Sequence, residues 1–226
     1  MCVTQNKQPH ERYHNTLCRP ILPFLPEHAL RVLDIGGGSG ATAIEVKKRC
    51  SSISAGVIDI ADITPDKALD FFVCGDAENE GVLEELANQY GPFDLVLCLD
   101  SLEHMKDPWT VVHRIHKTLS PNGYIIASIP NIQHYSAVIR LLIGTWDYRD
   151  SGILDRTHLR FFIKKTAIDL VKCSGLHVEK VDSTRPHKGL CGKIAYIFNI
   201  MTLHLFKNFF ELQYLVLAKN ITPKKL

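Results

Sequence analysis

One segment constrains this chain more than any other: an apolar strand that runs directly into a cluster of glycines. It reads Val32-Leu33-Asp34-Ile35-Gly36-Gly37-Gly38-Ser39-Gly40, and a helical pattern follows at once over 41–50. Glycines permit a tight turn and a close approach of the backbone to a ligand, while the N-terminus of the following helix offers free N–H groups. The segment therefore predicts a ligand-binding turn at the end of a buried strand.

The rest of the chain continues the alternation of strands and helices. Strand-like runs lie at 30–35, 53–60, 71–74, 93–99, 124–129, 176–181 and 211–218, and helical patterns at 41–50, 80–90, 107–119, 133–143, 164–174 and 190–206. The segment 61–70, which contains Pro65, is expected to be a loop or a single turn. Continuous apolar strands separated by helices predict an α/β fold with a doubly wound, seven-stranded sheet. Its ligand should lie beyond the carboxyl ends of the strands.

Composition narrows the class of protein. A chain of 226 residues with 46% hydrophobic and 22% charged residues is long enough for one large core and is typical of a globular domain. Seven of the 26 basic residues but only one of the 24 acids lie after position 183, so the body before it has 19 basic and 23 acidic residues. Because this body is acidic, a nucleic-acid partner is not expected. Seven scattered cysteines without a Cys-x-x-Cys pair predict reduced thiols rather than disulfides or a zinc site. With no secretory signal visible, the expected location is cytoplasmic.

The N-terminal region, residues 1–29, is expected to hold a short helix and then a proline-rich lead-in. Pro20, Pro23 and Pro26 fix φ and remove backbone donors, so the lead-in is predicted to be extended over 19–28.

The main domain is expected over 30–226, with an insertion or lid at 132–162 and an apolar helix at 190–207. Apolar residues at helical spacing in the 190–207 segment favour packing against the core. A peripheral membrane contact is the alternative.

Three aspartates at strand ends suggest which ligand the glycine turn binds. Asp34 precedes the turn, where its carboxylate would attract an ammonium group and repel a pyrophosphate. Asp59 ends the second strand, as a ribose-binding acid would, and Asp76 ends the third, where an adenine amino group could lie. Each aspartate could instead cap a turn. With Ala41 the turn also matches Gly-x-Gly-x-x-Ala, so a dinucleotide ligand remains an alternative.

Two further blocks accompany the glycine turn. The first is Phe93-Asp94-Leu95-Val96-Leu97-Cys98 with 101–108, and the second is Leu119-Ser120-Pro121-Asn122-Gly123-Tyr124. Together the three blocks resemble class I S-adenosyl-L-methionine-dependent methyltransferases: the glycine turn is similar to their first motif, the first block to their fourth-strand motif and the second to the turn before their fifth strand. The resemblance implies a Rossmann-like sheet, mostly parallel with an antiparallel last strand. It also implies the cofactor S-adenosyl-L-methionine.

Carried over position by position, the resemblance implies a set of cofactor contacts. These are Asp34, Ile35, Gly36, Gly37, Gly38, Gly40, Asp59, Ile60, Asp76, Ala77, Leu99 and Asp100. One position departs from the pattern, because many relatives carry the ribose-binding acid where this chain has Ile58.

A narrower resemblance concerns the acceptor side. The segments 128–134 and 152–162 are similar to a branch found beside methionine-biosynthesis genes and in surface-glycan clusters. The block Leu102-Glu103-His104 resembles ubiquinone-pathway O-methyltransferases. The leading hypothesis is therefore O-methylation of a small-molecule or glycan-type acceptor.

His104 is the first candidate for a catalytic base and His158 the second, because imidazole titrates near neutral pH. The candidates for binding the acceptor are Glu103, Asn131, Asp155, Arg156 and Arg160. His104 could instead fix its own loop, and the arginines could pair with nearby aspartates. No metal is expected, because adjacent residues such as Glu103 and His104 seldom ligate together and a further ligand is not evident.

Two other functions remain open. A dinucleotide-dependent oxidoreductase or epimerase would need a Tyr-x-x-x-Lys pair, and none follows the fourth strand. A non-catalytic partner protein in methionine metabolism would keep the cofactor-binding fold without a methyl acceptor.

Overall fold

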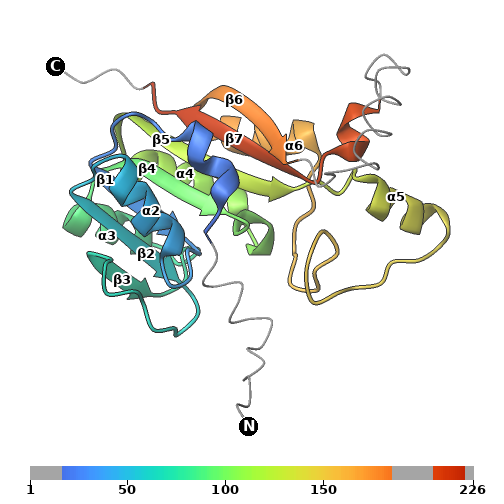
Figure 1. The fold of residues 1–226 in the computed structure, drawn as a ribbon, viewed down its shortest axis with the longest axis horizontal. Coiled ribbons are helices and arrows are strands. Elements are labelled where there is room, and N and C mark those ends of the chain that lie inside the picture. The colour runs from blue at the N-terminus through green and yellow to red at the C-terminus, as the bar shows by residue number, and fades with distance from the viewer. Residues whose placement is uncertain (1–16, 185–205, 222–226) are drawn as a thin grey trace, which may run out of the picture.

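The computed structural model describes residues 17–184 and 206–221. Their centre is one seven-stranded sheet with the order β3-β2-β1-β4-β5-β7-β6 (Figure 1). The strands are β1 (Arg31–Ile35), β2 (Ser54–Asp59), β3 (Phe71–Cys74), β4 (Phe93–Leu99), β5 (Leu119–Pro130), β6 (His177–Thr184) and β7 (Gln213–Lys219). The first five strands pair in parallel, and β7 runs antiparallel to both β5 and β6. The predicted α/β fold and the antiparallel last strand are confirmed.

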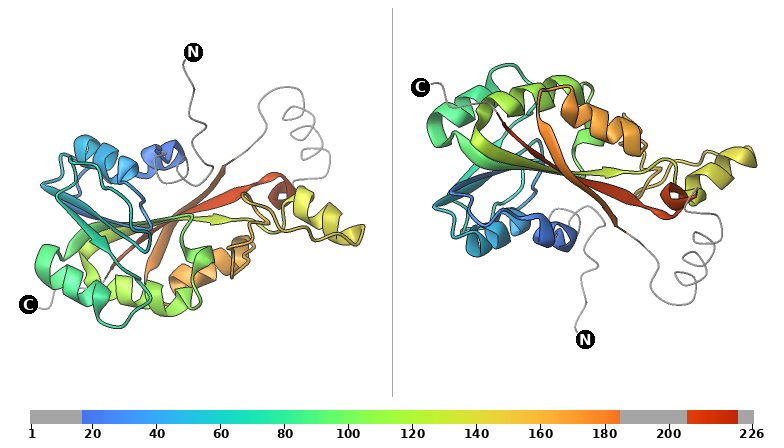
Figure 2. Two further views of the ribbon diagram at one scale, coloured as in Figure 1. Left: turned by 90° about the horizontal axis from the view of Figure 1, so that it is seen from below. Right: turned by 90° about the horizontal axis from the view of Figure 1, so that it is seen from above.

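Helices cover both faces of the sheet, as the apolar strands require (Figure 2). One face carries η1 (Arg19–Phe24) and α2 (Ala41–Arg49). The other carries α3 (Val82–Tyr90), α4 (Pro108–Thr118) and α6 (Lys164–Lys172). Each face has its own cluster of buried apolar side chains, so the sheet separates two cores.

Local chemistry determines where α4 begins and which of its faces is buried. Its N-cap is Asp107, whose carboxylate accepts hydrogen bonds from the backbone N–H and the hydroxyl of Thr110. Pro108 occupies the first turn, where its missing N–H leaves no bond unmade. Val111, Val112 and Ile115 recur on one side of the helix and are buried against the sheet.

The prediction of an extended lead-in over 19–28 is wrong, because Arg19–Phe24 forms the 3-10 helix η1. Proline is tolerated at the start of a helix, and Pro20 lies there. The helical turn also lets Ile21 and Phe24 enter the core beneath α2.

Other predicted elements are confirmed with shifted bounds. β5 begins at Leu119 rather than at 124, because Leu119 pairs with Phe93 across a register shift in β4. The segment 61–70 forms neither helix nor strand. The predicted helix at 190–206, all but its last residue, lies outside the described residues, and so does nearly all of the N-terminal helix.

Two short helices and α5 complete the described part of the chain: η2 (Leu102–His104), η3 (Lys207–Phe210) and α5 (Tyr135–Leu142). α5 and the loop after it extend beyond the carboxyl-terminal end of β5 (Figure 1). None of the helices within the described ranges is long and apolar enough to cross a bilayer.

Candidate active site

The glycine turn after β1 adopts a backbone that side chains would obstruct. Gly40 has φ +93°, and a Cβ atom there would lie 2.5 Å from a methyl carbon of Leu69. A Cβ atom on Gly37 would lie 2.6 Å from the carboxyl carbon of Asp34. The turn is therefore packed on both sides, and glycine leaves its backbone open to a ligand at the N-terminus of α2.

Asp34 is buried directly behind this turn. Its side chain is 1% exposed, and its Oδ1 atom has no hydrogen-bond partner among the described residues. Burial, together with the charge of Asp59, raises the pKa of Asp34 to about 7. A buried carboxyl group with an unmet acceptor is suited to a ligand that brings a positive charge.

The two other strand-end aspartates hold turns and also line the cavity described below. The Asp59 carboxylate accepts hydrogen bonds from the backbone N–H groups of Gly38, at 2.9 Å, and Ala61, at 2.8 Å. Asp76 accepts one from the N–H of Glu78 at 2.8 Å. The capping alternative is therefore seen for both residues, and it does not exclude contact with a ligand.

A continuous cavity of about 810 Å³ runs along the carboxyl ends of the strands. Seven of the residues implied as cofactor contacts line it: Ile35, Gly36, Asp59, Ile60, Asp76, Ala77 and Asp100. The other five are not part of its wall: Asp34, Gly37, Gly38, Gly40 and Leu99. On the other side the cavity reaches Glu103, His104 and His158, which we call the Glu–His–His cluster.

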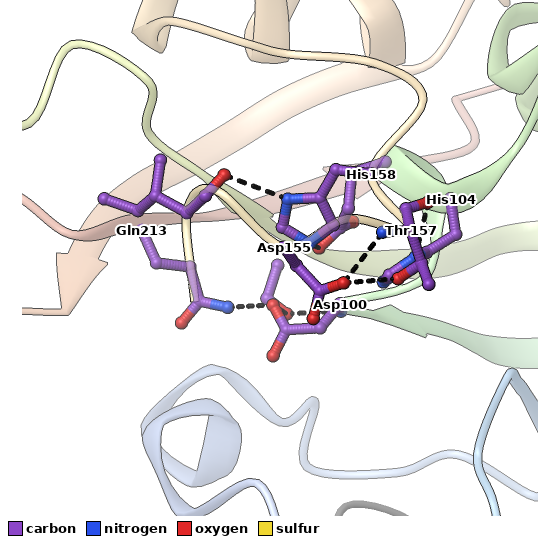
Figure 3. Close-up of polar contacts among 9 residues, drawn as sticks. Asp100, His104, Asp155, Thr157, His158 and Gln213 are labelled. Atoms are coloured by element: carbon purple, nitrogen blue, oxygen red, sulfur yellow. Dashed lines mark hydrogen bonds and ion pairs between the residues drawn. The ribbon is translucent and has the colours of Figure 1, made fainter. Parts of the chain in front are cut away.

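Asp100, which follows β4, is held by residues from two other strands (Figure 3). Its Oδ1 atom accepts hydrogen bonds from the hydroxyl of Ser128, at 3.1 Å, and from the amide of Gln213. Its backbone has φ +51°, a strained conformation for a residue other than glycine. Burial raises the pKa of Asp100 to about 6, although both hydrogen bonds favour its charged form. Gln213 was not a sequence candidate, because it lies 113 residues away in the chain.

Both imidazole rings of the Glu–His–His cluster are oriented by backbone carbonyl groups (Figure 3). Nδ1 of His104 lies 3.2 Å from the carbonyl oxygen of Thr157, and Nδ1 of His158 lies 3.1 Å from that of Ile153. A carbonyl group only accepts, so each neutral ring carries its proton on Nδ1 and its lone pair on Nε2. The two rings lie 4.8 Å apart, centre to centre.

Glu103 is the third member of the cluster. It is 1% exposed, and neither of its carboxylate oxygens has a hydrogen-bond partner among the described residues. Nε2 of His158 lies 3.9 Å from Oε1 of Glu103. Burial, reinforced by the charge of Asp100, raises the pKa of Glu103 well above its usual range. Burial and the neighbouring His104 lower the pKa of His158.

Backbone hydrogen bonds bring His158 to this place. The carbonyl oxygen of Glu103 accepts the N–H groups of Leu159, at 2.8 Å, and Arg160, at 3.0 Å. The segment around His158 is thereby fixed against η2. The three side chains of the cluster each offer a ligand atom within 4.8 Å of the others, so they could hold a metal ion.

The other acceptor-side candidates occupy different surroundings. Asp155 and Arg156 line the cavity, and Arg156 forms an ion pair with Asp150. Arg160 does not line it and donates to the carbonyl group of Lys106. Asn131 is fully buried outside the cavity wall, and its amide donates to the carbonyl groups of Asn208 and Glu211.

The strand order, the glycine turn after β1 and the acidic strand ends together define a class I methyltransferase fold, whose cofactor is S-adenosylmethionine. The chain belongs to the methyltransferase-domain family, whose sequence model matches residues 10–181. By family and fold the chain thus contains a class I methyltransferase domain.

Similar proteins agree with this class. The ubiquinone biosynthesis O-methyltransferase of Xylella fastidiosa (strain 9a5c) is 27% identical over 176 residues, which cover 71% of this chain and 66% of the relative. The matched part is slightly less than two thirds of that relative. A SAM-dependent methyltransferase from Archaeoglobus fulgidus has a TM-score of 0.60 at 19% identity, covering 89% of this chain and 90% of the other. The N-methyltransferase NodS from Bradyrhizobium japonicum WM9, solved with S-adenosyl-L-homocysteine, has a TM-score of 0.53 at 14% identity, covering 96% and 90%.

Proposed function

We propose that this protein transfers a methyl group from S-adenosylmethionine to a hydroxyl oxygen of a small-molecule or glycan-type acceptor. The observation that carries this proposal is the cavity shared by the glycine-turn side and the Glu–His–His cluster. A methyl donor on one side and an acceptor on the other would then meet in one cavity.

The cofactor side fits the group. The packed glycine turn leaves room for close backbone contact, and the unmet acceptor of Asp34 suits the ammonium group of the amino-acid part. Asp59 and Asp76 face the same cavity and are the proposed partners of the ribose and the adenine. The methyl group bound to the sulfonium is already activated, so the protein mainly has to align donor and acceptor. Such orientation contributes roughly 7–11 kcal/mol to lowering a barrier.

On the acceptor side, His104 is the proposed base. Its Nδ1 atom is held by Thr157, which leaves the Nε2 lone pair to accept the proton of the acceptor hydroxyl. His158 is the second candidate, with the same orientation of its ring. As the proton leaves the oxygen, the new O–C bond forms and the S–C bond breaks. Glu103, Asp155 and Arg156 are proposed to contact the acceptor, whereas Asn131 and Arg160 would act from outside the cavity.

The first experiment measures binding by isothermal titration calorimetry with S-adenosylhomocysteine and with NAD. We expect binding of S-adenosylhomocysteine alone. Methyl transfer is then measured on a panel of phenols, sugars and glycans with labelled S-adenosylmethionine. Exclusive binding of NAD would refute the proposal.

A variant tests the role of His104 once an acceptor is found. His104→Gln should lower kcat by about 10²–10⁴-fold and leave the affinity for S-adenosylhomocysteine unchanged. The matched control is His113→Gln, because His113 is exposed on α4, away from the cavity. Unchanged kcat in His104→Gln would remove this residue from the mechanism.

The alternatives have their own outcomes. Tight cofactor binding with no transfer to any acceptor class would favour a non-catalytic partner protein in methionine metabolism. A cytoplasmic location and a membrane contact of the 190–207 segment remain predictions, and liposome flotation tests the second.

A further inference from the structure

The Glu–His–His cluster presents more acceptors than its surroundings satisfy. Two imidazole rings have their Nδ1 atoms bound to carbonyl groups and their Nε2 lone pairs left over. The third member, Glu103, is almost completely buried and has no hydrogen-bond partner for either oxygen within the described ranges. A buried polar group without a partner calls for an explanation such as an ion.

We propose that Glu103, His104 and His158 bind one divalent transition-metal ion, with Zn²⁺ as the best fit. Their ligand atoms all lie within 4.8 Å of one another. Ligands about 2.1 Å from a tetrahedral Zn²⁺ ion lie about 3.4 Å apart. Side-chain adjustments of about 1 Å would therefore complete the coordination.

The donor set favours a transition metal over Mg²⁺ or Ca²⁺. Two imidazole nitrogens and one carboxylate suit Zn²⁺, Fe²⁺, Mn²⁺ or Co²⁺, whereas Mg²⁺ and Ca²⁺ take oxygen ligands. The carbonyl groups of Thr157 and Ile153 hold the rings as the outer partners of metal-bound histidines commonly do. The negative charges of Asp100 and Asp155 lie close enough to Glu103 to act on its carboxyl group. The same charges would attract a cation to this position.

The segment that carries His158 supplies the third ligand, which the sequence alone did not place beside Glu103 and His104. Glu103 and His104 are neighbours in the chain, and a site needs at least one further donor. His158 comes from a loop that is docked on η2 by two hydrogen bonds to the Glu103 carbonyl group. Three protein ligands leave a fourth position open, as in catalytic zinc sites.

The open position would face the cavity in which the acceptor is proposed to bind. The catalytic role of the ion therefore rests on the proposed function, although its binding does not. An acceptor hydroxyl bound to the ion loses its proton more readily, and that proton passes to solvent before the O–C bond forms and the S–C bond breaks. In the loaded enzyme the Nε2 atoms of both histidines would bind the ion rather than take the proton.

The experiment is a titration of untagged protein, stripped with chelator, with Zn²⁺, Co²⁺ and Mg²⁺. We expect one Zn²⁺ per chain, visible d–d absorption on binding Co²⁺, and much weaker binding of Mg²⁺. His158→Gln and Glu103→Gln should each weaken binding of Zn²⁺ at least tenfold, whereas the exposed-site control His113→Gln should not. Circular dichroism and the affinity for S-adenosylhomocysteine establish that each variant is folded.

Each outcome decides one of the two proposals. Equal affinity for Zn²⁺ in the wild type and in folded His158→Gln would overturn the metal site, and so would the absence of stoichiometric binding. Methyl transfer by protein free of metal would leave the proposed function standing and return His104 to the role of base. Stoichiometric Zn²⁺ binding without any methyl transfer would instead count against the proposed function.

Discussion

Asp34 offers the most direct test of how the cofactor side works. Its carboxyl group is buried, lies near Asp59 and has a pKa of about 7 in the free protein. If the ionised form is required to attract the cofactor's ammonium group, about nine tenths of the free protein is competent at pH 8 but only about one tenth at pH 6. The Kd for S-adenosylhomocysteine should therefore rise roughly tenfold when the pH falls from 8 to 6.

The variant Asp34→Asn removes this titration. Binding of S-adenosylhomocysteine should become weaker and nearly independent of pH between 6 and 8. The ammonium group of the probe lies beside a carboxylate, as in a free amino acid, and stays protonated in this interval, so the slope belongs to the protein. Isothermal titration calorimetry at three pH values gives the affinities. The control is Asp62→Asn, because Asp62 is exposed and lies close in the sequence.

A fall in pH that weakens binding of S-adenosylhomocysteine should at the same time stabilise the fold. The pKa of Asp34 is raised from 3.8 to about 7 on folding, so its contribution favours the fold at low pH and is lost as the pH rises through 7. The shift of about three pKa units corresponds to at most about 4 kcal/mol. Asp34→Asn should thus raise Tm at pH 8 by several degrees, by roughly two fifths of that gain at pH 5, and hardly at all below about pH 4.

The opposite effects of pH on cofactor affinity and on folding stability separate the possible roles of Asp34. A lower Tm at pH 8 together with an unchanged Kd would show that the Asp34 carboxylate is satisfied within the free protein and does not serve the cofactor. A slope that persists in Asp34→Asn would assign the titration to another group.

Three further substitutions test the fold around the site by thermal and urea unfolding. Gly40→Ala should cost about 1–3 kcal/mol more than Gly144→Ala, because both glycines have positive φ but only Gly40 would press against Leu69; equal losses would contradict this packing. Tyr214→Phe should stabilise the protein by about 1 kcal/mol, since it removes a buried hydroxyl without a partner in the described chain; a lower Tm would reveal a hidden partner. Asp107→Ala should cost about 1 kcal/mol through the lost N-cap of α4, and an unchanged urea midpoint would speak against it.

The sequence determined the order and kind of nearly all described elements. Buried strands are read from continuous apolar runs such as Phe93–Leu99, and helix starts from local signals such as Asp107 before Pro108. The glycine turn could be predicted because its conformational demand falls on residues adjacent in the chain. The same local rules failed at 19–28. There Arg19–Phe24 forms a 3-10 helix, because this conformation buries Ile21 and Phe24 in the core that they share with α2.

Only the tertiary structure decided which distant side chains meet. Gln213 reaches Asp100 because β7 lies beside β5, which in turn pairs with β4. His158 meets His104 because backbone hydrogen bonds dock its loop on η2, and no spacing in the sequence encodes that contact. Local patterns reflect the conformations of neighbouring residues, whereas such contacts depend on the whole sheet and on loops packed across it. The sequence therefore determined the cofactor side of this protein, and folding assembled the acceptor side.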